Sequence, residues 1–225
     1  MSGVTLPSAA KTIRYTGSKR KILPKIELIT KDVVFNNVLD AFSGSGIVSL
    51  FFKMQGKTVH SNDLAVYSKC IAETFLLSRE DKDSIQEEID YLNSLAPVEG
   101  WYSENYGGKS TEGGLSIQDD GLKKPFYIET ARKLDAIREE IDKLYPCLPI
   151  LSSTPPTGVR ASLRDLRSPS IGDITRDQCQ IRRSILLTSL LIALDSRCND
   201  MGHQVSYLRK WSPKALRPLH LEIPF

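Results

Sequence analysis

The sequence predicts an α/β fold in which a parallel sheet comes first and a mostly helical region follows. Short apolar segments alternate with helix-like segments through residues 22–77, as in chains that form parallel sheets. From residue 78 onward, apolar residues recur at spacings of three and four, which is typical of amphipathic helices. With 225 residues, of which 40% are hydrophobic and 25% charged, the chain is long enough to bury a core.

The first third of the chain predicts three helices and two strands. The helices are expected at residues 22–29, 47–55 and 66–77, and the strands at residues 37–40 and 58–62. Strands that are separated by a helix pair in parallel, because the helix must cross over the sheet.

The helical region is expected to begin with helices at residues 83–95 and 126–145. Residues 99–121 and 146–178 are rich in Gly, Ser, Pro and charged residues, and are predicted to be surface loops. Residues 181–198 predict a helix that is apolar on most of its surface and therefore packs against the sheet.

The last residues of the chain predict a short strand, because Leu219, Leu221 and Ile223 alternate with other residues. We expect three parts along the chain: a cofactor-binding part at residues 1–80, a helical and loop-rich region at residues 81–180, and a return to the core at residues 181–225.

The bulk composition predicts a cytoplasmic protein. Thirty basic and 27 acidic residues give a net charge of +3, which identifies no partner. No apolar run is long enough to span a membrane, so no membrane association is expected. The cysteines form no C-x-x-C pair and predict neither a zinc site nor a disulfide framework. They are Cys70, Cys147, Cys179 and Cys198.

The most specific local pattern is a strand that ends at Asp40 and runs into the turn Gly44-Ser45-Gly46. Glycines let backbone N–H groups and the next helix N-terminus approach a ligand. The second strand then delivers Asp63, about where such folds contact ribose hydroxyls. The pattern therefore predicts an adenosine-containing cofactor.

Three hypotheses compete for this turn. It is also compatible with a structural turn that binds nothing, and a nicotinamide dinucleotide site would need a third glycine where Ser49 stands. An S-adenosylmethionine site needs only the short turn, a carboxylate near the ammonium group and another on the ribose. Asp40 and Asp63 suit these two tasks, so S-adenosylmethionine is the favoured cofactor.

Upstream stands Tyr15-Thr16-Gly17-Ser18-Lys19, which taken alone is also compatible with a solvated basic loop. It precedes Asp40-Ala41-Phe42-Ser43-Gly44-Ser45-Gly46 and Ser61-Asn62-Asp63. With these three blocks in this order, the chain resembles the Dam-like class of DNA adenine-N6 methyltransferases. That class carries Y-x-G-x-K, D-x-F-x-G-x-G and S-N-D blocks.

The resemblance implies a Rossmann-like methyltransferase fold, S-adenosylmethionine as cofactor, double-stranded DNA as substrate and a place in restriction-modification. It implies a cofactor site lined by Tyr15, Lys19, Asp40, Phe42, Gly44, Gly46 and Asp63. It also implies that the middle of the chain reads DNA. Cations there that would meet phosphates are Lys123, Lys124, Arg160, Arg164 and Arg167, and further along Arg176, Arg182 and Arg183.

The same class uses an Asp-Pro-Pro-Tyr type tetrapeptide to hold the flipped adenine and its amine. These 225 residues contain no such tetrapeptide, and Pro155-Pro156, which lies between threonines, is predicted to be a turn. We therefore assign no catalytic residue and no metal ligand. We expect an incomplete sheet and a second polypeptide that supplies the tetrapeptide. The alternative is a non-catalytic or degenerate module that binds DNA or cofactor.

Overall fold

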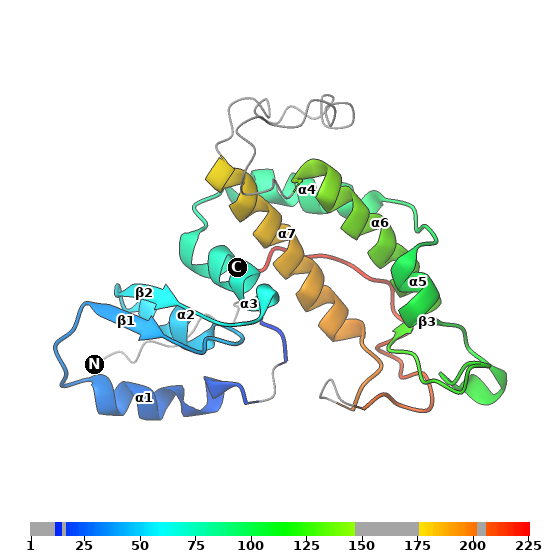
Figure 1. The fold of residues 1–225 in the computed structure, drawn as a ribbon, viewed down its shortest axis with the longest axis horizontal. Coiled ribbons are helices and arrows are strands. Elements are labelled where there is room, and N and C mark those ends of the chain that lie inside the picture. Colours follow the sequence, from blue (N-terminus) through cyan, green and yellow to red (C-terminus); the bar gives the residue numbers. More distant parts are fainter. Residues whose placement is uncertain (1–11, 15–16, 147–175, 202–205) are drawn as a thin grey trace.

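The computed structural model describes residues 12–14, 17–146, 176–201 and 206–225. Residues 17–77 form an α/β part, and residues 82–144 together with residues 176–197 form a helical part beside it (Figure 1). The predicted order of an α/β segment followed by helices is therefore confirmed.

The α/β part is built on two parallel strands. β1 (Asn37–Asp40) pairs with β2 (Thr58–Ser61), and Asp40 lies opposite Ser61. α2 (Ile47–Met54) connects the two strands and packs on both of them. These elements occupy the residues predicted for them, and their pairing is parallel as expected.

A small core joins the helices of this part. The 3-10 helix η1 (Lys19–Ile22) leads into α1 (Leu23–Thr30), which has a proline in its first turn. Leu23 of α1 packs with Ile47, Phe51 and Phe52 of α2. The rings of Phe35 and Phe52 meet edge to face, with centroids 5.8 Å apart. α1 is thereby held beside α2.

The next helix connects the α/β part to the helical part. α3 (Val66–Ala72) continues as the π-helical segment η2 (Glu73–Leu77), so the helix predicted at residues 66–77 is present with a widened last turn. The buried Thr74 donates to the carbonyl of Cys70 and lies 3.0 Å from the hydroxyl of Thr188. The widened turn is thus fixed to the long helix that contains Thr188.

The helical part has its own, larger core. α4 (Lys82–Ser94) and α6 (Ile128–Leu144) confirm the two predicted amphipathic helices. α7 (Arg176–Arg197) confirms the predicted last helix, which begins five residues earlier than expected. The buried apolar residues of these three helices form one cluster that includes Ile85, Ile89, Leu92, Leu134, Ile137, Ile141, Ile185, Leu186 and Leu190.

The expectation that the last helix packs against the sheet was wrong. α7 packs mainly on α3, η2 and α6, and Figure 1 shows it away from β1 and β2. Its broad apolar surface is buried because helices lie on more than one side of it.

The loop predicted at residues 99–121 contains a further helix, α5 (Trp101–Tyr106), followed by the short strand β3 (Gly107–Gly108) and the 3-10 helix η3 (Glu112–Gly114). The carboxylate of Asp135 in α6 accepts the first backbone N–H groups of α5, from Tyr102 and Ser103, both at 2.8 Å. β3 pairs with β4 (Phe126–Tyr127). This cap comes from a distant helix, so the local sequence gave no sign of it.

The strand predicted at the end of the chain was also wrong. Leu219 and Leu221 are buried against the helical core, while His220 and Glu222 are exposed. Asn93 of α4 both donates to the carbonyl of Leu221, at 3.0 Å, and accepts its N–H, at 2.9 Å. The alternation of apolar residues therefore arises because every second side chain of an extended segment is buried. The backbone of this segment pairs with the side chain of Asn93 and not with another strand.

Two further expectations concern cysteines and membranes. Cys70, Cys179 and Cys198 are free thiols, and Cys147 lies outside the described residues, as does Pro155-Pro156. Within the described parts of the chain, no helix is both long and apolar enough to cross a membrane.

A buried ion cluster joins α7 to α4. Arg182 forms ion pairs with Glu88 and, at 2.8 Å, with Glu80, and Tyr145 donates to Glu88 at 2.6 Å. Burial raises the pKa of Glu88 above its usual range, although Tyr145 and Arg182 oppose this. Arg183 is also buried and pairs with Asp142 at 2.6 Å. The expectation that Arg182 and Arg183 meet DNA phosphates was therefore wrong.

Replacement of Arg182 by alanine is expected to destabilise the chain by about 3–5 kcal/mol, because it leaves the carboxylate of Glu88 buried without its cation. Urea unfolding followed by circular dichroism measures this. Lys143→Ala removes an exposed ion pair with Glu139 and should cost less than about 1 kcal/mol. Equal losses of unfolding free energy in the two variants would show that the buried cluster stabilises the chain no more than an exposed ion pair does.

Candidate functional site

The glycine turn after β1 has a fixed backbone. Gly44 and Gly46 have φ values of 51° and 70°, in the left-handed region that favours glycine. The N–H of Gly46 donates to the carbonyl of Ser43 at 2.8 Å, and the N–H of Ser43 donates to the carbonyl of Asn62 at 3.0 Å. A Cβ added to Gly46 would lie 3.2 Å from Ile71 of α3. The turn therefore sits tightly between the end of β2 and α3.

Asp63 connects the end of β2 to this turn. Its Oδ2 accepts the N–H of Gly44 at 2.7 Å, and its Oδ1 accepts the N–H of Ala65 at 2.9 Å. Hydrogen bonds from Ala65 and Gly44 lower the pKa of Asp63 below its usual value, so the carboxylate is ionised near neutral pH. Each carboxylate oxygen keeps a lone pair for a further donor such as a hydroxyl.

Asp40 lies at the other end of the turn, and its Oδ2 accepts the hydroxyl of Ser49 at 2.7 Å. Ser49 is buried in the first turn of α2. Sequence analysis noted Ser49 only as the residue that replaces a third glycine. The structure shows that it orients the carboxylate of Asp40, which a strand-end acid followed by a helix-start serine could have indicated.

The remaining predicted cofactor residues are less closely joined. Phe42 is 91% exposed on the turn. Lys19 lies in η1, which packs on α2, and its ammonium donates to the carbonyl of Gly17 at 2.9 Å. Tyr15 lies outside the described residues. The structure thus unites Asp40, the two glycines and Asp63, with Lys19 in a neighbouring segment.

A cavity of about 380 Å³ opens beside the turn, between β2 and α3. This volume is within the range of small-molecule sites. Its polar wall includes Ser43, Asn62, Asp63, Lys69 and Glu73. Lys69 and Glu73 lie 3.6 Å apart, so both signs of charge are present. The cavity places a ligand-sized space next to the carboxylate of Asp63.

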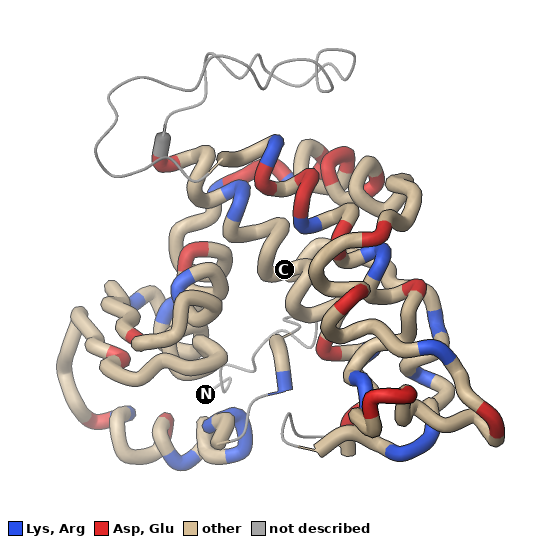
Figure 2. Tube along the Cα trace, turned by 45° about the vertical axis from the view of Figure 1, so that its right-hand side comes forward, with Lys and Arg blue, Asp and Glu red and all other residues tan. Residues whose placement is uncertain are grey.

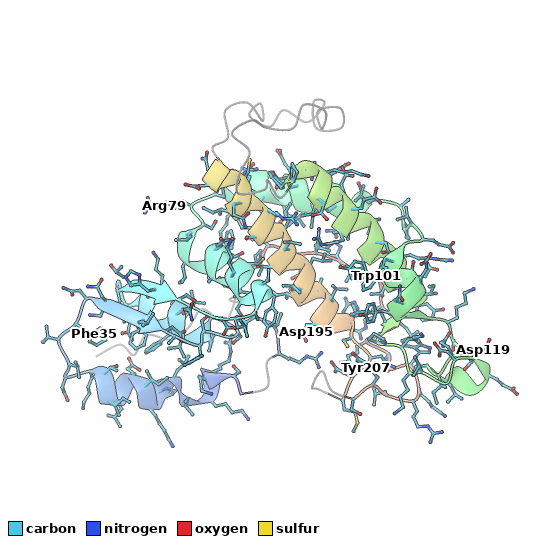
Figure 3. All side chains as sticks on the ribbon, viewed as in Figure 1. Phe35, Arg79, Trp101, Asp119, Asp195 and Tyr207 are labelled. Carbon is cyan, nitrogen blue, oxygen red and sulfur yellow. The ribbon has the colours of Figure 1, made fainter. Side chains whose placement is uncertain are left out.

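A second cavity, of about 420 Å³, lies between α3 and the helices α5, α6 and α7, and is mainly apolar. Its wall includes Trp101, Tyr102 and Tyr106 of α5, and the rings of Trp101 and Tyr102 meet edge to face with centroids 5.1 Å apart. Figure 3 shows Trp101 on α5, away from β1 and β2. Sequence analysis missed this aromatic wall because it predicted a loop here.

The predicted DNA contacts are only partly described. Lys123 is exposed, whereas the ammonium of Lys124 pairs with Asp120 at 2.7 Å and its side chain is 12% exposed. The others, Arg160, Arg164 and Arg167, lie outside the described residues. Figure 2 shows acidic and basic residues interspersed along α6, and η1 and the start of α1 are mainly basic. α4, in contrast, carries only acidic charges after Lys82.

The chain is similar to one protein family and to several known proteins of related function. A family model described as D12 class N6 adenine-specific DNA methyltransferase matches residues 15–151. The type II methyltransferase M.NlaIII of Neisseria lactamica is 27% identical over 215 residues, which cover 93% of this chain and 53% of the relative. The modification methylase StsI of Streptococcus sanguinis is 25% identical over 226 residues, which cover 93% of this chain and 28% of the relative.

The modification methylase LlaI of Lactococcus lactis subsp. lactis is 26% identical over 216 residues, which cover 91% of this chain and 28% of the relative. The chain therefore spans about half the length of one of these relatives and less than a third of the other two. No solved structure matches the chain.

The hydrogen bonds to Asp63 predict a measurable titration. Because the folded-state pKa is lowered, their contribution to stability is present above the ordinary value of 3.8 and is lost as pH falls through the folded-state value. In an NMR titration, the amide signals of Gly44 and Ala65 should shift with a midpoint below 3.8. The shift should vanish in Asp63→Asn. A midpoint at or above 3.8 in the unmutated chain would contradict these contacts.

Proposed function

The chain belongs to the D12 class N6 adenine-specific DNA methyltransferase family, and we propose that it is the S-adenosylmethionine-binding and DNA-recognition portion of a restriction-modification enzyme. The observation that carries the proposal is the hydrogen bond from the Gly44 amide to Asp63. It joins the two strand ends of a strand–turn–helix–strand unit at one edge. In a Rossmann-like sheet that edge is where a nucleotide-like cofactor binds.

The residues of this edge have separate tasks in the proposed site. Asp63 keeps lone pairs for the ribose hydroxyls, and Asp40, oriented by Ser49, is available to the ammonium group of the cofactor. Because Gly44 and Gly46 have no Cβ atom, the cofactor can approach the backbone of the turn. Tyr15, Lys19 and Phe42 would complete the wall. The bound cofactor supplies an electrophilic methyl group on a sulfonium, and no metal or covalent enzyme intermediate is proposed.

The helical region would face DNA. We propose residues 1–80 as the cofactor part, residues 81–180 as the DNA-recognition region and residues 181–225 as the return to the core. Contacts of α7 with both α3 and α6 support a last segment that joins the two parts. Lys123 is exposed and available to a phosphate, and Arg160, Arg164 and Arg167 are proposed as further phosphate contacts. Lys124 would reach a phosphate only by leaving Asp120.

We further propose that a second polypeptide carries the Asp-Pro-Pro-Tyr type tetrapeptide, which these 225 residues lack. In the described residues, β1 and β2 form a two-stranded sheet, and such sheets have open edges that pair readily with other strands. Leu39, Leu64 and Val66 are 69%, 101% and 78% exposed around it. A non-catalytic binding module is the alternative.

Isothermal titration with S-adenosylmethionine tests the cofactor site. We expect the chain to bind, and Asp63→Asn to weaken binding at least about tenfold, or about 1.4 kcal/mol, because an amide N–H₂ then faces the N–H of Gly44. Asp40→Asn should act in the same direction. Asp32→Asn is the matched control, since the Asp32 side chain is 88% exposed at the end of α1.

Two outcomes would contradict this site. One is binding that is unchanged in both Asp40→Asn and Asp63→Asn. The other is tight binding of a nicotinamide dinucleotide without binding of S-adenosylmethionine, which would favour the dinucleotide hypothesis.

A methylation assay tests the proposed partner. The purified chain is incubated with tritium-labelled S-adenosylmethionine and unmethylated double-stranded DNA. We expect cofactor binding without incorporation of label into adenine, because these 225 residues contain no Asp-Pro-Pro-Tyr type tetrapeptide to accept the adenine amine. Strong incorporation by the chain alone would contradict the need for a second polypeptide.

A further inference from the structure

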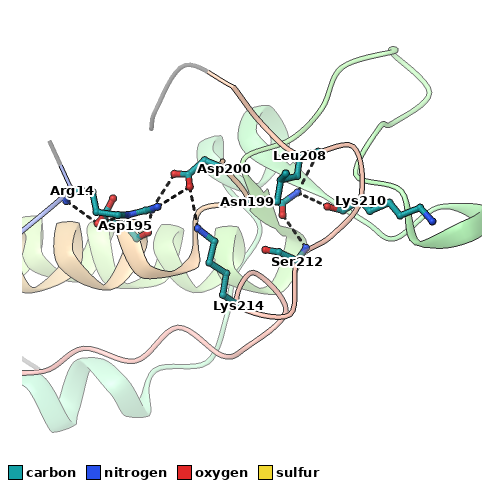
Figure 4. A network of polar contacts seen from close by, with 8 residues as sticks. All are labelled: Arg14, Asp195, Asn199, Asp200, Leu208, Lys210, Ser212 and Lys214. Atoms are coloured by element: carbon teal, nitrogen blue, oxygen red, sulfur yellow. Dashed lines mark hydrogen bonds and ion pairs between the residues drawn. The ribbon is translucent and has the colours of Figure 1, made fainter. Parts of the chain in front are cut away.

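Arg14, the residue before Tyr15, contacts the far end of α7 (Figure 4). Its backbone N–H and its Nε donate to Oδ2 of Asp195, at 2.9 and 3.1 Å. Its two terminal nitrogens donate to the two carboxylate oxygens of Asp200, at 2.8 and 3.0 Å. Bidentate pairs of this kind are strong and fix the orientation of both partners.

The two acids of the cluster are buried, and its charges balance. The side chain of Asp200 is 1% exposed and that of Asp195 is 13% exposed. Lys214 is a second cation on Asp200, at 3.0 Å. Asp200 would therefore still be paired after replacement of Arg14. This matters for a test, because a buried carboxylate without any cation would strongly destabilise the chain.

Arg14 directly precedes the first cofactor block, Tyr15-Thr16-Gly17-Ser18-Lys19. The guanidinium of Arg20, which follows the block, donates to the hydroxyl of Thr12 at 3.2 Å. η1, which contains Arg20, packs on α2, and Gly46 caps the N-terminus of α2. The position of Arg14 is thereby tied to that of the glycine turn.

Beyond Asp200 the same cluster reaches the region proposed to face DNA. The side chain of the adjacent, fully buried Asn199 accepts the N–H of Ser212 at 3.0 Å and donates to the carbonyl of Lys210 at 3.2 Å. Lys210 forms a backbone bridge with Leu115, in the segment between α5 and α6. A continuous set of contacts thus joins this segment to Arg14.

We propose that Arg14 is a positioning residue that couples the S-adenosylmethionine site to the DNA-facing segment through Asp195 and Asp200. The proposal rests on the cofactor site proposed above. Contacts that hold the block in place reduce the ordering cost of binding. Coupling is reciprocal, so DNA that holds the segment at Leu115 in this position tightens cofactor binding, and cofactor tightens DNA binding by the same factor.

The test compares Arg14→Gln with the unmutated chain by titration of S-adenosylmethionine, with and without unmethylated double-stranded DNA of mixed sequence. We expect DNA to lower the Kd of the unmutated chain, and Arg14→Gln to raise the Kd about tenfold and to abolish the effect of DNA. Arg14→Lys should restore part of the affinity. Arg79→Gln is the control, because Arg79 is exposed after η2, outside this cluster and outside the residues proposed to face DNA.

Thermal unfolding by circular dichroism accompanies each titration, and Asp195→Asn serves as a second variant that leaves Asp200 with both cations. We expect it to raise the Kd in the same direction. Cofactor binding by Arg14→Gln and Asp195→Asn that equals that of the unmutated chain, with and without DNA, would overturn the inference alone. Absence of binding by the unmutated chain would contradict the proposed cofactor site, and the inference with it.

Discussion

The carboxylate of Asp63 is the contact on which the candidate site depends. It accepts two backbone N–H groups, from Gly44 and Ala65, and so closes the turn after β1 onto the end of β2. Without it, two positive-φ glycines would leave the turn free to move. The buried Ser49 performs a related task for Asp40. Two acids at neighbouring strand ends are thus held in place before any ligand binds. This favours ligand affinity, because little free energy is then needed to order these side chains on binding.

The α/β part was predictable because its signals are local. The boundaries of β1, α2 and β2 follow from a short apolar run, a glycine turn and a helical period, and the structure agrees with them within one residue. The acids at 40 and 63 were predictable for the same reason, since parallel strands end at one edge. The role of Ser49 was missed, because a serine at a helix start has several uses and only its combination with a strand-end acid indicates this one.

The helical part was less predictable because its decisive contacts are distant in sequence. α5 depends on Asp135, the C-terminal segment on Asn93, and Arg182 on Glu80 and Glu88. Arg14 lies more than 180 positions before its partners Asp195 and Asp200. A charge count treats such arginines as candidates for phosphate contact. Burial beside carboxylates shows instead that they fix helices and segments, so DNA contacts are better sought among exposed cations such as Lys123.

The central claim is that the turn closed by Asp63 is where the cofactor binds. Backbone amide spectra of the isotope-labelled chain, recorded by NMR with and without S-adenosylhomocysteine, test this most directly. The account predicts that the largest shifts fall on Gly44, Gly46 and the residues from Asn62 to Ala65. Shifts confined to the aromatic cavity at Trp101, with the glycine turn unchanged, would contradict it.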